Sequence, residues 1–253
     1  MNPSPNVLQS VYNHHCSLRS SDADFSGRIK VSSLIQMFTD AGWAHVHKLR
    51  LGYEHLNRSR LTWVNTSLRL ELSRHISWQQ FGQITVRTWL AGRDGFYWIR
   101  DFLLLDGNNR EFGRASTASI LLDWETRKPY LKDDVVPVLE VAELPRVFST
   151  PNAKLAKWGQ GGPWVECRAF SVQLGELDIN RHVSNACYAQ WLLDSYALPF
   201  YQQHKVSRIQ LQYLKEALYG EELVLLRHCE NSDDFCLKAG SSELLRARIV
   251  WEQ

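Results

Sequence analysis

The sequence has no long hydrophobic run, and nowhere do apolar residues approach the 18 or more in succession that a membrane-spanning helix needs. The first ten residues also lack the basic start and the apolar core of a secretory signal. Cysteine is sparse and odd in number, at 5 of 253 residues, and no Cys-x-x-Cys pair occurs, which argues against a disulfide framework or a zinc knuckle. These absences predict a cytoplasmic protein with reduced thiols.

A strong net charge is missing as well. Lys and Arg number 29 and Asp and Glu 27, so the formal charge is +2, and no basic tail or run indicates nucleic-acid binding. There is no glycine-rich phosphate loop with its lysine. His14 and His15, like His45 and His47, lack acidic or thiol partners at metal-ligand spacing. We therefore expect no metal, no cofactor, and neither nucleic acid nor a membrane as partner.

What is abundant is tryptophan, with 10 residues in a chain that is 44% apolar. Because indole rings are costly to leave exposed, their number indicates a large aromatic core or an apolar ligand channel. The length allows one large domain or two small ones.

In the first half of the chain, apolar periodicity predicts one strand, one helix and then about four antiparallel strands. The strand covers residues 11–19, and a polar turn precedes a helix that opens at Gly27 and Arg28. A basic connection follows at 48–60. The last two strands flank a turn that is typical of a hairpin, Asp106, Gly107, Asn108 and Asn109.

The second half repeats this order of elements. A strand is predicted at 165–172, a polar turn at 175–182 and a helix at 185–200, stopped near Pro199. The remaining strands are predicted at 208–214, at 222–229 and on both sides of a turn at 240–242.

Between the halves lies a proline-rich segment, residues 126–163, which we expect to link an N-terminal unit, 1–125, to a C-terminal unit, 164–253. A short helix is predicted inside it, near 135–141. Its prolines are Pro129, Pro137, Pro145, Pro151 and Pro163.

A shift of 154 residues brings several identical residues of the two halves together: Val11 and Val165, Ser17 and Ser171, Asp24 and Asp178, Gln36 and Gln190, and Asp40 and Asp194. The matching order of elements is the stronger sign of duplication. Each copy is expected to wrap a curved, mostly antiparallel sheet around one helix, which makes an α+β protein. Because a lone copy would expose a sheet edge and part of its apolar helix, we expect the copies to pair side by side.

Three reactive side chains, Asp178, Asn180 and His182, stand at every second position just before the second helix. An extended segment would point them the same way. The start of the helix would aim free N–H groups and a positive dipole end at the same place. Opposite Asn180 and His182, the first half has Ser26 and Arg28. We therefore predict one active site per chain, in the C-terminal unit.

The stretch from 178 to 194 resembles the active-site signature of acyl-ACP thioesterases (ACP, acyl carrier protein), D-x-N-x-H-V-x-N followed by Tyr, Trp and an acidic residue. The stretch 115–129 is similar to the end of the family's first unit, and the resemblance extends over nearly the whole chain. It implies a tandem (double) hotdog fold, in agreement with the duplication. It also implies hydrolysis of fatty acyl-ACP to free fatty acid and holo-ACP, by a bacterial cytoplasmic form without the plastid transit peptide.

In this family an acidic residue on the strand after the helix completes the site, and the matching stretch 211–218 places that role on Glu216. Some members carry a cysteine at the next position, where this chain has Ala217, so attack by water is favoured over a thiolate. Glu216 is then the general base, and His182 orients it and passes a proton to the leaving thiol. Asn180 and the helix start stabilise the oxyanion.

Each of these residues also has a structural alternative. Glu216 could be a strand-surface glutamate, His182 a core or capping histidine, and Asn180 a helix cap or turn residue. Asp178 is expected to orient Asn180 or His182. The alternative is a turn aspartate, because Asp24 occupies the same place in the other copy.

The acyl chain is expected in an apolar tunnel of the N-terminal unit. Residues of its helix that we expect near the chain are Met37, Phe38 and Trp43. Because ACP is acidic, its docking site is expected among Lys48, Arg50, Arg58 and Arg60.

Several alternatives stay open at this point. Cys187, five residues beyond His182, is a possible partner in a Cys–His pair, although a small buried residue is favoured. The chain could prefer acyl-CoA, or bind acyl groups without cleaving them. A double-hotdog dehydratase is disfavoured because its H-x-x-x-G motif has Ala186 at the glycine position. Monomer and homodimer are both compatible with the sequence.

Overall fold

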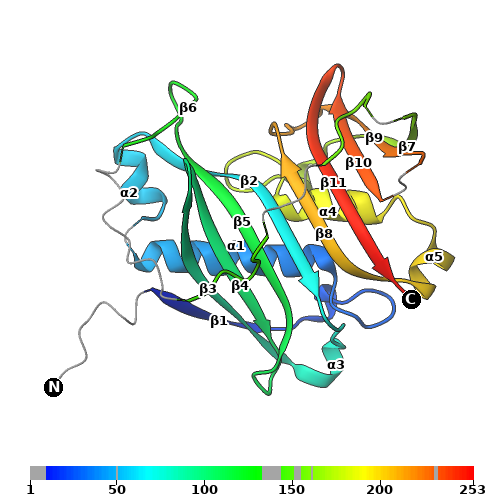
Figure 1. The fold of residues 1–253 in the computed structure, drawn as a ribbon, viewed down its shortest axis with the longest axis horizontal. Helices are drawn as coiled ribbons and strands as arrows, with labels where there is room; N and C mark the ends of the chain where they lie inside the picture. Colours follow the sequence, from blue (N-terminus) through cyan, green and yellow to red (C-terminus); the bar gives the residue numbers. More distant parts are fainter. Residues whose placement is uncertain (1–9, 50, 133–143, 151–154, 161, 231–232) are drawn as a thin grey trace.

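The computed structural model describes residues 10–49, 51–132, 144–150, 155–160, 162–230 and 233–253. Two units follow one plan, in which a strand and a polar turn lead into a helix and four antiparallel strands (Figure 1). The first unit contains β1 (Val11–Ser17), α1 (Val31–Lys48), α2 (Tyr53–Arg58), β2 (Leu61–Leu72), α3 (Trp78–Phe81), β3 (Gln83–Asp94), β4 (Tyr97–Leu105), β5 (Glu111–Asp123) and β6 (Lys128–Pro129). The second contains β7 (Trp164–Ser171), α4 (Asn185–Leu193), α5 (Leu198–Gln203), β8 (Lys205–Tyr213), β9 (Glu222–His228), β10 (Asp234–Ala239) and β11 (Ser242–Glu252).

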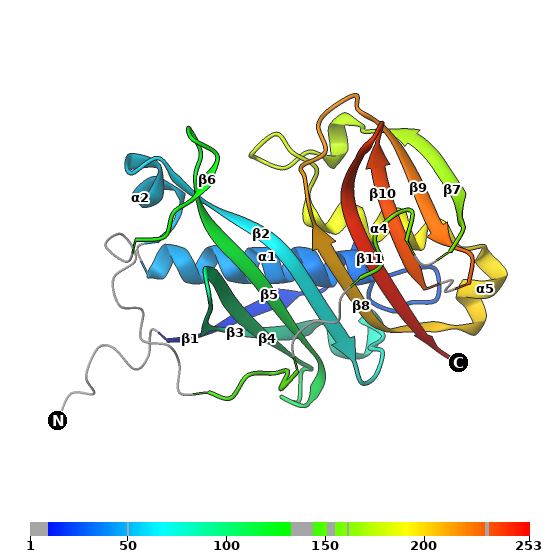
Figure 2. The same ribbon diagram turned by 45° about the horizontal axis from the view of Figure 1, so that its top comes forward.

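All the strands of the described residues belong to one sheet, in the order β1-β3-β4-β5-β2-β8-β11-β10-β9-β7, with β6 paired to β5. The two units meet where β2 pairs antiparallel with β8, from Ser67 opposite Gln212 to Glu71 opposite Arg208. Figures 1 and 2 show these two strands side by side. The expected side-by-side pairing of the copies is therefore confirmed, and it covers one exposed edge of each sheet.

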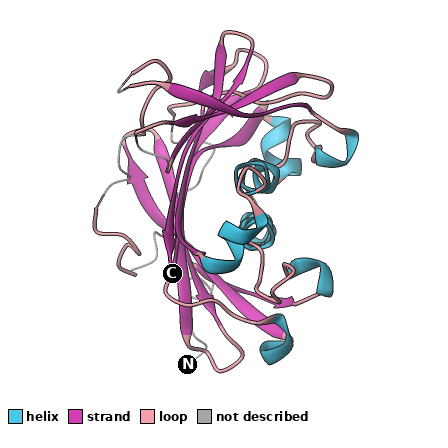
Figure 3. Cartoon of the chain, turned by 90° about the vertical axis from the view of Figure 1, so that its right-hand side faces the viewer, coloured by secondary structure: helices cyan, strands magenta, loops and turns pink. Residues whose placement is uncertain are grey.

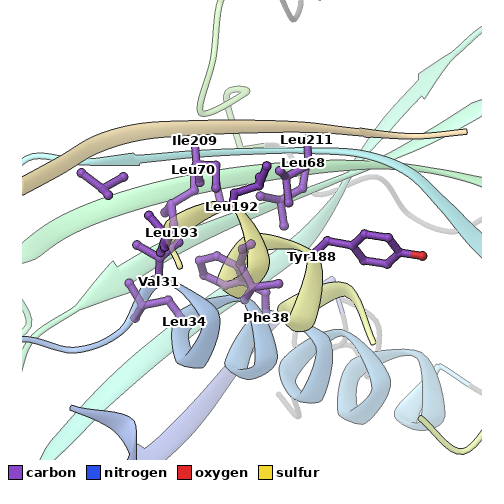
Figure 4. Close-up of a cluster of buried hydrophobic side chains, with 14 of the residues drawn as sticks. Val31, Leu34, Phe38, Leu68, Leu70, Tyr188, Leu192, Leu193, Ile209 and Leu211 are labelled. Carbon is purple, nitrogen blue, oxygen red and sulfur yellow. The ribbon is translucent and has the colours of Figure 1, made fainter. Parts of the chain in front are cut away.

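The sheet curves around α1 and α4, which Figure 3 shows nearly end-on against its concave face. Alternation along β2 turns Leu68 and Leu70 toward the helices, and β8 contributes Ile209 and Leu211 beside them. Side chains of both helices complete this cluster in Figure 4: Val31, Leu34, Phe38, Tyr188, Leu192 and Leu193. One hydrophobic core thus joins the two units. Truncating a member such as Leu70 to Ala is expected to cost about 2–5 kcal/mol.

The duplication is confirmed at the level of single hydrogen bonds. In α1 the amide of Gln36 donates to Asp40 at 2.9 Å, and in α4 that of Gln190 donates to Asp194 at 2.7 Å. Both pairs are among the identical residues that the shift of 154 superimposes. The hairpin turns expected at 106–109 and 240–242 also join strands, between β4 and β5 and between β10 and β11.

Two expectations about the first unit were wrong. The helix begins at Val31 rather than Gly27, because Gly27 has a φ of +78° and belongs to a tight turn that precedes α1. The connection at 48–60 is not simply a basic loop, since it contains α2, which buries Leu56. The single apolar side chain in so short a helix left little periodicity to detect.

The helix predicted at 185–200 is also wrong in its extent. It ends at Leu193, and Pro199 lies in the first turn of a second helix, α5. Proline has no N–H, and the first turn of a helix needs none for its own hydrogen bonds, so this proline starts a helix instead of stopping one.

The predicted linker lies in part against the face of the sheet that is turned away from the helices. The ring of Phe148 lies 4.0 Å from the guanidinium carbon of Arg69 and 5.8 Å from that of Arg114. The N–H of Val147 donates to Asp101 at 2.9 Å, and burial raises the pKa of this carboxyl. The short helix expected at 135–141 lies outside the described residues.

None of the helices in the described residues is long and apolar enough to cross a membrane.

Candidate active site

The three reactive residues lie in a tight turn, the Asp178 turn (residues 178–182), and not in the extended segment that their spacing suggested. The N–H of Asp178 donates to the carbonyl oxygen of His182 at 2.8 Å, and Arg181 has a φ of +65°. Asp178, Asn180 and His182 nevertheless line one cavity. Their common direction comes from the reversal of the chain, not from strand alternation.

The carboxylate of Asp178 holds this turn together. Its Oδ1 accepts the N–H of Asn180 at 2.8 Å and that of His182 at 3.3 Å. Such side-chain-to-backbone bonds are the usual role of an aspartate at the start of a turn. Asp178 therefore orients Asn180 and His182 through their backbone, which combines the two alternatives that the sequence left open.

Glu216 lies in the loop after β8 and not on a strand, which corrects the expected position. The strand ends at Tyr213, and the loop is fixed instead by Ala217, whose carbonyl accepts the N–H of Val183 at 3.1 Å. The N–H of Ala217 donates to the hydroxyl of Tyr188 at 3.0 Å. The loop is thus tied both to the Asp178 turn and to α4.

These ties bring Glu216 to His182. Glu216 Oε2 lies 3.4 Å from His182 Nε2, and each side chain is 32% exposed. A carboxylate and an imidazole at this distance, both within reach of water, can exchange a proton when the pair tightens around a substrate.

Asn180 supplies a free amide beside this pair. Its backbone N–H is used by Asp178, whereas its side-chain amide makes no hydrogen bond to the described residues. The first residue of α4, Asn185, also lines the cavity, so the helix starts at the site as expected. Backbone and side-chain donors are therefore available for a developing negative charge.

The sequence did not single out Arg127, which comes from the first unit. Its Nη2 lies 3.0 Å from Glu216 Oε2, although the two residues are 89 positions apart. The residue belongs to the stretch 115–129 that resembles the family. Its contact with Glu216 could not be inferred, because that contact depends on how the two units dock.

The cavity has a volume of about 740 Å³. The second unit contributes the Asp178 turn, the first two turns of α4 and the loop after β8, and the first unit contributes the remainder. The large apolar residues that the first unit contributes are Phe38, Trp43, Val46, Leu49, Leu51, Leu56, Leu61, Trp63, Val64, Leu90, Trp98, Phe102, Ile120 and Leu122. Trp43, Trp63 and Trp98 therefore line a cavity. This agrees with the apolar ligand channel, one of the two explanations expected for the many tryptophans.

Of the three expected lining residues, Phe38 and Trp43 line this cavity and Met37 does not. Met37 is 7% exposed and borders a separate pocket of about 580 Å³. Neighbouring residues on a helix are about 100° apart around its axis, so Met37 and Phe38 face different ways.

A half-buried cation also lines the cavity. Nη1 of Arg100 lies 2.7 Å from His45 Nδ1 and 3.4 Å from Thr88 Oγ1. Burial lowers the pKa of Arg100 to about 10. The guanidinium therefore keeps its charge near neutral pH, in a cavity that is otherwise largely apolar.

Two tyrosines border the cavity near the loop after β8. Burial raises the pKa of Tyr188 to about 12, so its hydroxyl stays protonated while it accepts the N–H of Ala217. The hydroxyl of Tyr213 is buried and has no hydrogen-bond partner among the described residues. The signature singled out the first tyrosine but not the second.

Cys187 does not line the cavity. The hydroxyl of Ser184 donates to its Sγ at 3.2 Å, and burial raises the pKa of the thiol. A thiol that is kept protonated and away from the cavity is a poor nucleophile, which favours a small buried residue. Within the described residues, no group of three or more His, Cys, Asp or Glu could hold a metal ion.

A curved sheet wrapped around one helix, present twice in a chain and joined into one continuous sheet, defines a double hotdog protein. Residues 9–138 match the model of the acyl-ACP thioesterase N-terminal domain, and residues 165–251 match that of the C-terminal domain. The chain belongs to the acyl-ACP thioesterase family.

Relatives of known name are distant in sequence. The palmitoyl-acyl carrier protein thioesterase of Gossypium hirsutum, a chloroplastic protein, is 22% identical over 227 residues, which cover 85% of this chain and 54% of that protein. The chain thus spans about half the length of the chloroplastic relatives that it matches.

Solved structures agree in fold. An acyl-ACP thioesterase from Bacteroides thetaiotaomicron superimposes with a TM-score of 0.85 at 22% identity, over 97% of this chain and 99% of that one. A 12:0-ACP thioesterase from Umbellularia californica superimposes with a TM-score of 0.79 at 20% identity, over 96% and 97%.

Proposed function

We propose that the chain hydrolyses fatty acyl-ACP to free fatty acid and holo-ACP, with water as the nucleophile. One observation carries this proposal: the His182–Glu216 pair opens onto an apolar cavity of about 740 Å³. Membership of the acyl-ACP thioesterase family supports ACP as the carrier of the substrate. The names of the relatives support a fatty acyl group as the part that is released.

Glu216 acts as the general base. Its carboxylate takes a proton from water, and the oxygen of that water adds to the thioester carbonyl carbon while the carbonyl electrons move to oxygen. The amide of Asn180 and the N–H groups at the start of α4 donate to this oxyanion. Asp178 keeps Asn180 and His182 in place through the turn.

His182 completes the proton transfer. When the tetrahedral intermediate collapses, the carbonyl re-forms and the carbon–sulfur bond breaks. The proton held by Glu216 passes through the imidazole to the leaving sulfur. The water is then divided between a fatty acid and a thiol, and both side chains return to their starting protonation.

The acyl chain occupies the cavity of the first unit, in contact with Phe38 and Trp43. Each buried methylene contributes about 0.8 kcal/mol, so affinity rises with chain length until the cavity is full. This arrangement separates recognition, in the first unit, from hydrolysis, in the second.

The carrier docks on cations beside the cavity. Arg58 ends α2, which also lines the cavity, and Arg60 accepts the N–H of Trp124 on its backbone carbonyl. Lys48 lies 4.4 Å from the ring of Tyr12, and Arg50 lies outside the described residues. Because the side chain of Arg60 pairs with Glu125, we retain Arg58 alone for the dock. The site takes all its residues from one chain, so it is compatible with a monomer as well as a homodimer.

The test is release of free thiol from acyl-ACP. We expect Glu216→Gln and His182→Ala to lower kcat by about 100-fold or more, because acid–base catalysis of this kind contributes 10²- to 10⁴-fold. Cys187→Ser is the matched control and should stay near the wild-type rate. Near-wild-type turnover in both active-site variants would overturn the mechanism.

The same experiment separates the alternative functions. A faster reaction with acyl-CoA than with acyl-ACP would identify a CoA thioesterase. Tight acyl binding without thiol release would indicate a binding module. An enoyl product from a 3-hydroxyacyl thioester would indicate a dehydratase.

A further inference from the structure

The turn that presents Arg127 is held rigidly by the first unit. We call residues 123–127 the Arg127 turn. Asp123 Oδ1 accepts the N–H groups of Glu125 at 3.0 Å and Thr126 at 2.9 Å, and the carbonyl of Asp123 accepts the N–H of Arg127 at 2.8 Å. Arg127 itself has a φ of +57°, in the left-handed region that few residues other than glycine adopt. This conformation aims its side chain out of the first unit and toward the second.

The contact with Glu216 is specific to one carboxylate oxygen. Oε2 faces both Arg127 Nη2, at 3.0 Å, and His182 Nε2, at 3.4 Å. Oε1 makes no hydrogen bond to the described residues, and neither does any other part of the Arg127 side chain. Within the part of the chain that the structure describes, the arginine side chain thus has one partner, and this contact leaves Oε1 as the oxygen available to a water molecule.

We propose that Arg127 is a positioning residue of the active site: the first unit orients the general base of the second through the Arg127–Glu216 ion pair. This inference rests on the proposed function, because it gives a role to a residue that touches Glu216. Arg127 holds Oε2 so that Oε1 faces the reacting water. The first unit then has a part in catalysis as well as in acyl binding.

The chain offers a close control for the charge of Arg127. Arg60 lies beside the same turn, where its carbonyl accepts the N–H of Trp124 and its side chain pairs with Glu125. The side chain of Arg60 is 60% exposed and that of Arg127 is 61% exposed. Substituting either arginine removes an exposed cation from this end of the molecule. Of the two arginines, only Arg127 contacts Glu216.

The experiment compares Arg127→Ala and Arg127→Lys with Arg60→Ala, on acyl-ACP and on an acyl-N-acetylcysteamine thioester with the same acyl chain. We expect Arg127→Ala to lower kcat about tenfold to hundredfold on both substrates, since small misplacements of a reacting group have effects of this size. Arg127→Lys should recover part of the loss. Arg60→Ala should leave kcat unchanged on the small substrate.

Two further measurements separate positioning from a merely structural role. On the small substrate, Arg127→Ala should lower kcat and leave KM near the wild-type value, because Arg127 contacts Glu216 and positions it for the chemical step. Guanidinium ion, far below denaturing concentrations, should restore part of the activity of Arg127→Ala. It should leave the wild-type rate unchanged. Thermal melts show that each variant is folded, and Arg127→Gln replaces Arg127→Ala if the latter is not.

The inference is overturned if Arg127→Ala matches Arg60→Ala in kcat on the small substrate. It is equally overturned if Arg127→Ala raises KM for acyl-ACP while the small substrate reacts normally, since Arg127 would then be a docking cation. If the wild-type protein cleaves no acyl thioester at all, the proposed function itself fails, and this outcome is visible before any variant is made.

Discussion

The two units contain the same turn with different chemistry. In the Asp24 turn (residues 24–28), Asp24 Oδ1 accepts the N–H of Ser26 at 2.8 Å and that of Arg28 at 3.0 Å. In the Asp178 turn, Asp178 Oδ1 accepts the corresponding groups at 2.8 and 3.3 Å. Gly27 has a φ of +78° where the second turn has +65°. The same hydrogen bonds therefore stabilise both turns. The turns differ in the side chains at their third and fifth positions.

In the first turn the place of His182 is taken by Arg28, which binds the protein itself. Its guanidinium donates to the carbonyl oxygens of Tyr201 at 3.1 Å and His204 at 3.3 Å. It thereby attaches the first unit to α5 of the second. The side chain at this position joins the two units instead of facing a substrate.

The place of Glu216 is also changed. Ile29 N donates to the carbonyl of Ile76 at 3.2 Å, as Val183 N donates to that of Ala217, so His75 stands where Glu216 stands in the other unit. Burial, followed by the charge of Arg28, lowers the pKa of His75. Two basic side chains thus replace an imidazole and a carboxylate. The Asp24 turn thus connects the two units, whereas the Asp178 turn presents His182 to Glu216.

The most severe test of this comparison makes the second turn resemble the first. His182→Arg places the first unit's residue beside Glu216, and we expect thiol release to fall at least ~100-fold, since an arginine cannot pass on a proton. The Asp178 turn should remain folded, because its hydrogen bonds use the backbone. The thermal unfolding midpoint provides the control, and residual turnover within tenfold of wild type would contradict the role of His182.

Removing the aspartate from each turn distinguishes its effect on stability from its effect on catalysis. Asp178→Ala and Asp24→Ala both remove a carboxylate that accepts two N–H groups, and each should lower the free energy of unfolding by about 1 kcal/mol. Asp178→Ala alone should also lower kcat, by roughly tenfold to hundredfold, because Asn180 and His182 lose their positions. Denaturant unfolding and thiol release measure the two effects. Equal activity in the two variants would show that the turn has no part in catalysis.

Arg28→Ala tests whether the first turn stabilises the contact between the two units. We expect the free energy of unfolding to fall by about 1.5–3 kcal/mol, through loss of charge-assisted hydrogen bonds to the carbonyls of Tyr201 and His204. The kcat should change little, because Arg28 does not line the cavity. Denaturant unfolding gives the first quantity. A large fall in kcat without a change in stability would mean that this turn is functional.

The smallest effect is expected at His75. Because its pKa is lowered in the folded chain, the unfolded chain takes up a proton more readily below its ordinary pKa of about 6.5, and stability falls as the pH drops. His75→Gln should therefore make the thermal midpoint less dependent on pH between 7 and 5. The exposed His55, changed to Gln, serves as the control. An unchanged slope in His75→Gln would contradict the assignment.

Much of the fold could be predicted because its signals are local. Alternation along β2 and β8 and the turn residues at 106–109 depend only on neighbours in the chain, and the shift of 154 residues compares two such local patterns. Positions that depend on distant contacts were predicted poorly. Glu216 was expected on a strand, but contacts with Val183 and Tyr188 hold it in a loop. The helix expected to end near Pro199 ends at Leu193.

The residues of the candidate site were likewise predictable only where the signal is local. Asp178, Asn180, His182 and Glu216 were predicted from a motif, and the structure brings all four to one cavity. Met37 was predicted from its neighbours on the helix and lies elsewhere, because one step along a helix turns a side chain by about 100°. Arg100 and Arg127 gave no signal, since neither periodicity nor spacing shows which cation faces a cavity.

The sequence by itself determined that the chain is a duplicated unit and that only the second copy of the turn carries an asparagine and a histidine, because both follow from the order of residues along the chain. Only the tertiary structure decided that the candidate site takes residues from both units. The pairing of β2 with β8 brings the Arg127 turn to Glu216 and the cavity of the first unit to His182. Residues 89 positions apart meet at 3.0 Å because two separately predictable units dock edge to edge.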